Sequence, residues 1–181
     1  MTQPLYTIAD ILAVTNGTAP GLDPAAPINS ASIDSRELGP DALFVAIRGD
    51  RFDGHDFVAT ALQNGAAAAL VSRDPGPGRI LVPDALKGLE DIARAARARS
   101  AAKIVGVTGS VGKTTTKEAI RLVFEAAAPT HASIKSFTNH WGVPLMLARL
   151  PETAQFGVFA VGMSGPGEIR PLWKLVRPPI G

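Results

Sequence analysis

The stretch from Ile104 to Thr116 limits most strongly what this chain can fold into. It reads Ile-Val-Gly-Val-Thr-Gly-Ser-Val-Gly-Lys-Thr-Thr-Thr. Its first residues are apolar or small, which is typical of a buried strand. Gly109 and Gly112 then mark a tight loop, and Lys113 opens a helix. A strand that passes through a glycine loop directly into a helix predicts a βα unit of a parallel sheet.

The same stretch predicts a binding site for the phosphates of a nucleotide. Backbone N–H groups of such a loop and of the helix start surround an anion, a lysine neutralises charge, and a threonine hydroxyl ligates Mg2+. The pattern is Thr-Gly-x-x-Gly-Lys-Thr-Thr rather than the full Walker pattern, because Val107 stands where that pattern has its first glycine. The alternative is an ordinary glycine-rich turn with a chance lysine. The joint register of strand, glycines, lysine and threonine favours phosphate binding.

Composition sets the broad class of the protein. The 181 residues suffice for one large or two small domains, and 46% hydrophobic residues support a real core. A formal net charge of +2 gives no argument for a nucleic-acid or membrane partner. Cysteine is absent, which excludes disulfides and thiolate metal sites. With no secretory leader and no apolar run of membrane-spanning length, we expect a cytoplasmic protein.

Alternating strand and helix patterns predict an α/β fold in two parts. Residues 1–83 are expected to form a small mixed α/β domain. Residues 84–181 are expected to form a parallel-sheet ATPase domain around the phosphate loop, but two or three strands make that sheet incomplete. The helix after the loop is expected to run from about Gly112 to Ala127. Its core-facing residues are predicted to be Ala119, Ile120, Val123 and Phe124.

Two polar clusters leave alternatives open. Asp34-Ser35-Arg36 suits phosphate contact, but from these residues alone a solvated turn with a local Asp–Arg pair is favoured. The polar segment around Asn139 suits either a ligand-facing loop or a plain surface loop. His55, between Asp53 and Asp56, is expected to belong to a helix start capped by an aspartate rather than to a metal site.

Three segments, in the same order, resemble the Mur ligases of peptidoglycan synthesis. The first combines Asp34-Ser35-Arg36 with residues 41–49 and 53–57, the second is residues 108–118, and the third combines residues 139–144 with 162–163 and 166–169. The resemblance covers almost the whole chain. The first segment is shared by the diaminopimelate-adding and D-alanyl-D-alanine-adding members. The other two are more similar to the D-alanyl-D-alanine-adding type.

This resemblance implies an ATP-dependent amide ligase. ATP would phosphorylate the terminal carboxylate of a UDP-N-acetylmuramoyl-peptide, and the amine of D-alanyl-D-alanine would attack the acyl phosphate. The resemblance implies ATP and Mg2+ as cofactors, with Lys113 catalytic, Thr114 as the Mg2+ ligand, and Ser35 and Arg36 at the UDP-sugar substrate. It also implies a monomer in the full-length enzyme. The residues implied at the nucleotide are Gly109, Ser110, Val111, Gly112, Lys113, Thr114, Thr115 and Asn139.

Two departures from the family pattern affect this expectation. Ala160 stands where the family has a glutamate that helps to hold Mg2+, and Ser164-Gly165 stands where Asn-His is common. The later parts of the family sequence have no counterpart up to Gly181. We therefore expect an N-terminal portion of a ligase that is inactive by itself. The alternatives are a diaminopimelate-adding ligase and a non-catalytic module that binds a nucleotide or a UDP-sugar.

Overall fold

The computed structural model describes residues 3–134, 137–163 and 165–179. It divides into two compact units, residues 1–92 and 93–181, which we describe separately. Both are built from strands and helices around a parallel sheet, so the expected α/β class is confirmed. The division falls within helix α3 (Ala85–Arg99). The boundary expected at residues 83 and 84 stays a prediction.

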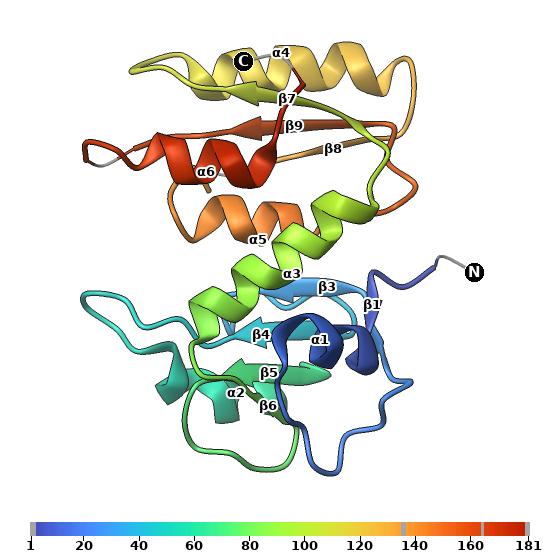
Figure 1. The fold of residues 1–181 in the computed structure, drawn as a ribbon, viewed down its shortest axis with the longest axis vertical. Coiled ribbons are helices and arrows are strands. Elements are labelled where there is room, and N and C mark those ends of the chain that lie inside the picture. Colours follow the sequence, from blue (N-terminus) through green and yellow to red (C-terminus); the bar gives the residue numbers. More distant parts are fainter. Residues whose placement is uncertain (1–2, 135–136, 164, 180–181) are drawn as a thin grey trace. The chain divides into compact units, whose positions relative to one another are not determined.

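The first unit is organised around a four-stranded parallel sheet of order β3-β4-β5-β6. Its strands are β3 (Ser30–Ser32), β4 (Ala42–Val45), β5 (Ala68–Val71) and β6 (Arg79–Leu81). Because the strands are parallel, their carboxyl ends lie along one edge (Figure 1). A separate antiparallel pair joins β1 (Tyr6–Thr7) to β2 (Pro27–Ile28).

Helices cover both faces of this sheet. Val58 and Ala61 of α2 (Val58–Gln63), which follows the 3-10 turn η1 (Gly54–Phe57), pack in one cluster with Phe44 and Ala69. Gly88 of α3 lies against Leu70, whose side chain points to the opposite face. Helix α1 (Ile8–Thr15) begins with the capping box that Thr7 and Asp10 predict, since each side chain accepts from the other's backbone N–H.

The second unit has a three-stranded parallel sheet with β9 in the middle. Its strands are β7 (Lys103–Val107), β9 (Phe156–Ala160) and β8 (Thr130–Ala132). Helix α4 (Lys113–Glu125) covers one face, while α5 (Gly142–Ala148) and α6 (Ile169–Val176) cover the other (Figure 1). The expected parallel sheet around the phosphate loop is confirmed.

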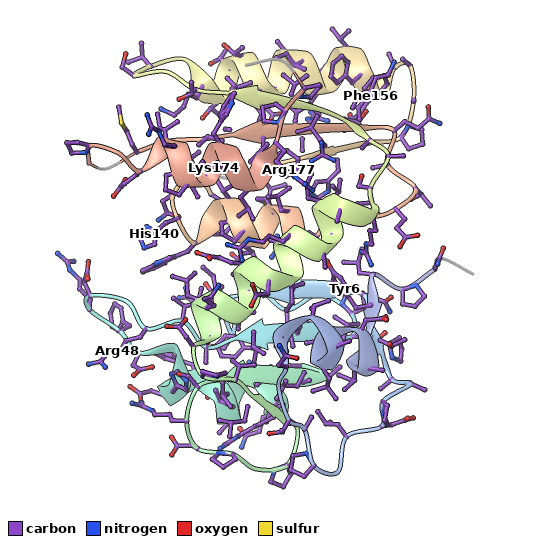
Figure 2. The ribbon with its side chains drawn as sticks, viewed as in Figure 1. Tyr6, Arg48, His140, Phe156, Lys174 and Arg177 are labelled. Atoms are coloured by element: carbon purple, nitrogen blue, oxygen red, sulfur yellow. The ribbon has the colours of Figure 1, made fainter. Side chains whose placement is uncertain are left out.

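The predicted core face of α4 is partly wrong. Ala119 is exposed, and Val123 remains 68% exposed. The sheet-facing side carries the buried Lys117 and also Phe124, which stacks on Phe156 with ring centroids 4.4 Å apart. Phe156, at the start of β9, is labelled in Figure 2. The predicted core face did not include Lys117. Instead, Lys117 is buried, and its ammonium group donates to the Ser133 carbonyl and pairs with Glu118. These two partners compensate the buried charge.

The two units carry opposite charges that the overall net charge conceals. Residues 1–92 hold six Lys or Arg against twelve carboxylates, whereas residues 93–181 hold twelve against four. The formal charges are therefore −6 and +8. Among the residues described, no helix combines the length and apolarity needed to cross a membrane.

Candidate functional site

The phosphate-loop residues follow β7 at the carboxyl edge of the second unit's sheet. The backbone of Gly112 is left-handed, with φ 78°, a conformation that residues other than glycine rarely adopt. It occupies the N-cap of α4 without a side-chain hydrogen bond, in contrast to Thr7 at α1. The first N–H groups of α4 thus have no capping oxygen from that position. Residues 108–112 and 114–116 are exposed, so the loop is open to a ligand.

Lys113 folds back over this loop. Its Nζ donates to the carbonyl oxygen of Gly109 at 2.6 Å. The side chain is half-buried, whereas the neighbouring Thr114 and Thr115 are exposed. The ammonium group therefore lies against the backbone of the loop that an anion would enter. Its partner there, the Gly109 carbonyl oxygen, is neutral.

Two further segments meet the loop at this edge. The N–H of Val161 donates to the Val107 carbonyl at 2.8 Å, and the N–H of Gly162 donates to the Thr138 carbonyl at 2.7 Å. A Cβ on Gly162 would lie 2.7 Å from Thr138 Oγ1 and 3.6 Å from Lys113 Cε. The second residue after β9 is therefore a glycine, because the Thr138 side chain leaves no room for a Cβ. Sequence reasoning missed Thr138 and Gly162, although one precedes Asn139 and the other closely follows a strand end.

Asn139 has a local structural task. Its Oδ1 accepts from the N–H groups of Gly142, at 2.9 Å, and Trp141, at 3.3 Å, at the start of α5. A Cβ on Gly142 would lie only 2.5 Å from the Phe137 backbone, which accounts for the glycine of this Asn-x-x-Gly pattern. The amide nitrogen of Asn139 is the group left to contact a ligand.

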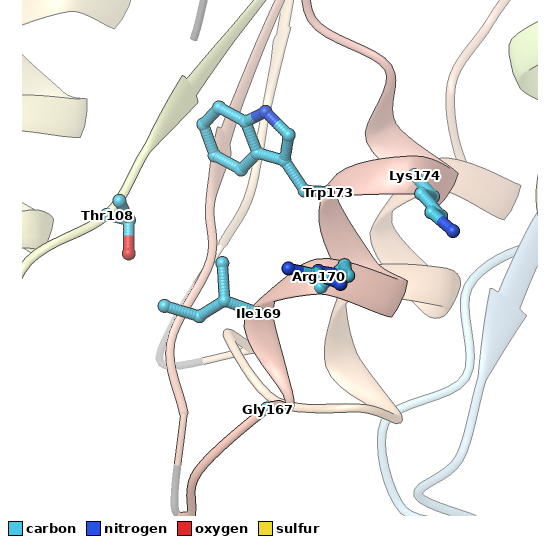
Figure 3. A pocket seen from close by; sticks show the side chains of 6 residues that line it. All are labelled: Thr108, Gly167, Ile169, Arg170, Trp173 and Lys174. Atoms are coloured by element: carbon cyan, nitrogen blue, oxygen red, sulfur yellow. The ribbon is translucent and has the colours of Figure 1, made fainter.

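An open apolar cavity of about 620 Å³ begins beside the loop at Thr108. Figure 3 shows Trp173 projecting from α6 toward β7, with Ile169 below it. The indole ring packs on β7 where Gly106 lacks a side chain, since a Cβ there would lie 2.6 Å from the ring. The cavity is thus formed by α6 and the outer strand of the sheet.

Carboxylates are scarce around the loop. The second unit has only four, and each has a partner within the unit. Glu118 and Glu125 bind Arg121 on α4, and hydrogen bonds from Lys117 and Arg121 hold the pKa of Glu118 below its ordinary value. Glu152 pairs with Arg99 and precedes the amino end of β9, away from the loop. Glu168 accepts from the Gly165 N–H at 3.2 Å.

The residues present do not fit a Mg2+ ion held as in P-loop enzymes. There the loop threonine shares the metal with a carboxylate from a neighbouring strand. The corresponding strand end carries Ala160, paired in register with Val107. No group of three potential metal ligands occurs among the described residues. Ser164, the other departure, lies outside the described residues.

In the first unit, Asp34 and Arg36 form a local ion pair. The guanidinium donates from Nε at 2.9 Å and from Nη2 at 2.7 Å, and the Arg36 side chain is 84% exposed. Ser35 is buried, and its carbonyl accepts from Asn64 Nδ2 at 3.0 Å. This is the geometry of the turn alternative, placed beyond the carboxyl end of β3.

His55 fastens a loop to the same edge of the sheet. Asp53 Oδ1 accepts from the His55 backbone N–H at 2.9 Å and lies 2.6 Å from Nδ1, while Nε2 accepts from the Ser72 N–H at 3.0 Å. This pattern assigns the ring proton to Nδ1. The bonds from His55 lower the pKa of Asp53. The aspartate caps η1, as the sequence predicts.

Comparisons with known proteins identify the family. Residues 27–103 match the model of the Mur ligase family catalytic domain, and residues 107–181 match that of the Mur ligase middle domain. The chain belongs to the Mur ligase family. The two matches together account for most of its length, and the second contains the whole phosphate loop.

Two relatives of this Mur ligase are named as D-alanyl-D-alanine-adding ligases. The UDP-N-acetylmuramoyl-tripeptide–D-alanyl-D-alanine ligase of Bacillus subtilis (strain 168) is 40% identical over 156 residues, covering 83% of the chain and 34% of that protein. The Escherichia coli (strain K12) ligase of the same name is 34% identical over 174 residues, covering 95% and 38%. The chain thus spans little more than a third of these relatives.

Solved structures show the same likeness. The UDP-N-acetylmuramoylalanyl-D-glutamyl-2,6-diaminopimelate–D-alanyl-D-alanyl ligase from Acinetobacter baumannii aligns with a TM-score of 0.84 at 33% identity, covering 98% of this chain and 41% of that one. A MurF ligase from Thermotoga maritima in complex with ADP aligns with a TM-score of 0.68 at 32% identity, covering 82% and 35%. That relative binds an adenine nucleotide.

Proposed function

We propose that this Mur ligase chain is the UDP-sugar-binding and nucleotide-binding part of an ATP-dependent amide ligase. The reaction adds D-alanyl-D-alanine to UDP-N-acetylmuramoyl-tripeptide. One observation carries the proposal: Lys113 lies over an open glycine loop, and Thr138 and Gly162 lie beside it in the same unit. The names of the relatives supply the substrates. Since the reaction uses ATP and a UDP-sugar, we assign it to the cytoplasm. We also propose that the full-length enzyme is a monomer.

ATP would supply the γ-phosphoryl group in this reaction. An oxygen of the peptide carboxylate takes up the phosphoryl group as the bond to ADP breaks. The amine nitrogen then forms a bond to the carbonyl carbon, and phosphate leaves. Lys113 and the N–H groups of residues 109–115 would hold the phosphates and oppose their charge. Ala160, beside Val107, leaves the strand end without a carboxylate that could hold Mg2+ together with Thr114.

The first unit would hold the UDP-sugar substrate at the carboxyl edge of its sheet. We assign Ser35 and Arg36 to this contact. Arg36 can exchange Asp34 for a diphosphate oxygen at little cost, because water screens an exposed ion pair and makes it weak. Its bidentate donors suit either anion.

Two other functions remain to be separated by experiment. A structure of UDP-N-acetylmuramoyl-L-alanyl-D-glutamate–2,6-diaminopimelate ligase resembles this chain in fold alone, at 20% identity and a TM-score of 0.50. A diaminopimelate-adding ligase is thus less well supported. A binding module without turnover is favoured by Ala160 alone.

Calorimetric titration tests the assignment. We expect the 181-residue chain to bind UDP-N-acetylmuramoyl-tripeptide more tightly than the dipeptide form. Arg36→Ala should weaken binding by about tenfold, the worth of a charge-assisted hydrogen bond. Lys87→Ala, which removes a comparable exposed pair with Asp91, is the control and should leave affinity unchanged. Preference for the dipeptide would support the diaminopimelate-adding alternative. Phosphate release dependent on ATP, tripeptide and D-alanyl-D-alanine should be absent from this chain.

A further inference from the structure

The end of β9 faces the phosphate loop without a charged group. Ala160 is the last residue of β9 and is paired with Val107, the last residue of β7. Two residues later, Gly162 approaches the stem of Lys113. A side chain at position 160 therefore sits on the central strand, at the edge where the loop begins. Here it is a methyl group, 3% exposed.

The remaining carboxylates do not compensate. Glu118 and Glu125 are paired with Arg121, and Glu152 lies before the opposite end of β9. Among the described residues of this unit, Glu168 is the one carboxylate near the carboxyl edge, and its Oε2 accepts from the Gly165 N–H. Twelve Lys or Arg residues against four carboxylates leave this unit at a formal charge of +8.

These two features change what the loop prefers to bind. In a P-loop site the strand carboxylate helps to hold Mg2+, and it repels nucleotide phosphates when the metal is absent. Without that carboxylate, a bare polyphosphate would meet the ammonium of Lys113 and the loop N–H groups, in a unit whose formal charge is positive. The metal then loses a protein ligand, and the anion loses a repulsive neighbour.

We propose that this loop binds the metal-free form of a nucleoside di- or triphosphate, and that Mg2+ does not raise its affinity. The inference rests on the proposed nucleotide binding at residues 109–115. It makes this site a metal-independent polyphosphate site, which distinguishes it from a P-loop that needs Mg2+ for tight binding.

The test is a pair of ADP titrations into the 181-residue chain by calorimetry, one with Mg2+ and one with EDTA. We expect dissociation constants within about threefold of each other. In Ala160→Glu, EDTA should weaken ADP binding at least about tenfold relative to Mg2+, because the new carboxylate repels the bare phosphates and ligates the metal.

Three controls isolate the cause. Ala160→Gln adds similar bulk without charge and should keep the wild-type ratio. Met163→Glu puts the same charge on an exposed residue three positions later, 62% accessible, and should also keep it. Glu168→Gln should change nothing. Because position 160 is buried, fluorescence of Trp141 and Trp173 checks that each variant folds, and the wild-type ratio stands as a test by itself.

The outcomes separate the two proposals. Wild-type ADP binding that Mg2+ strengthens tenfold or more overturns the metal-independent site and leaves the nucleotide function intact. Loss of that enhancement in Glu168→Gln would identify the carboxylate responsible. No ADP binding under either condition overturns both proposals.

Discussion

Lys113 Nζ lies 2.6 Å from the carbonyl oxygen of Gly109, four residues earlier in the chain. The lysine therefore satisfies its charge with the backbone of the loop that it serves. A carbonyl oxygen is a weaker partner for an ammonium group than a phosphate oxygen is, because the latter carries charge. The contact keeps the side chain over the loop and gives way when an anion arrives. The half-buried stem beside Gly162 limits where the ammonium can move.

The C-terminus of α6 depends on one arginine of α3. Arg97 donates from Nε to the Val176 carbonyl at 2.8 Å and from Nη2 to the Arg177 carbonyl at 2.9 Å. These are carbonyls that a helix end leaves without intrahelical partners. We expect Arg97→Ala to destabilise the second unit by about 2 kcal/mol, and Arg170→Ala, at an exposed position of α6, by less than about 0.5 kcal/mol.

Tryptophan fluorescence during urea unfolding measures this difference. Trp141 and Trp173 are the two tryptophans of the chain, and both belong to the second unit. The signal therefore follows that unit alone. Equal midpoints for the two arginine variants would show that the bonds to Val176 and Arg177 contribute nothing.

The second unit should lose stability in mild acid because of His131. Burial lowers the pKa of this imidazole below its ordinary value of 6.5, and the charge of Arg149 lowers it further. Its Nε2 lies 2.8 Å from the Met146 carbonyl, and its ring packs near Phe159. The folded state thus binds a proton less readily than the unfolded state, so stability is retained above about pH 6.5 and decreases as the pH falls below it.

We expect the urea midpoint of the second unit to fall between pH 7 and pH 5. The slope contributed by one histidine is at most about 1.4 kcal/mol per pH unit. His131→Phe should be less stable at pH 7, because it loses the bond to Met146, yet its midpoint should vary less with pH. A variant with the same pH slope as the wild type would rule out His131 as the cause.

The two faces of α4 should respond differently to truncation. Phe124 stacks on Phe156, whereas Val123, the next residue back, is 68% exposed. Phe124→Ala is expected to cost about 2 kcal/mol, and Val123→Ala less than about 0.5 kcal/mol. Urea unfolding followed by tryptophan fluorescence compares them. A larger loss for Val123→Ala would support the core face expected from the sequence.

Much of the architecture could be predicted from the sequence because local signals agreed with the fold. The capping box at Thr7 and Asp10, the aspartate cap before η1, and the apolar strand before the glycine loop each have a purely local cause. The left-handed backbone of Gly112 also has a local cause, since glycine adopts a positive φ without steric cost. These features need no knowledge of distant residues.

The features missed by sequence reasoning depend on distant contacts. Lys117 is buried because Ser133 supplies a carbonyl sixteen residues away, which a periodic pattern cannot show. Thr138 and Gly162 lie beside Lys113 only because β9 inserts between β7 and β8. The charge separation of the units was hidden because opposite excesses nearly cancel in the net charge of +2.

The central claim is that Lys113 and its loop bind a nucleotide, and ADP titration of three proteins by calorimetry tests it most directly. Lys113→Ala should weaken ADP binding at least about tenfold, since it removes a charge-assisted bond to phosphate. Lys103→Ala makes the same change in charge at the amino end of β7 and should keep wild-type affinity within about twofold. Equal affinities for the wild type and Lys113→Ala, or equal losses in both variants, would contradict the account.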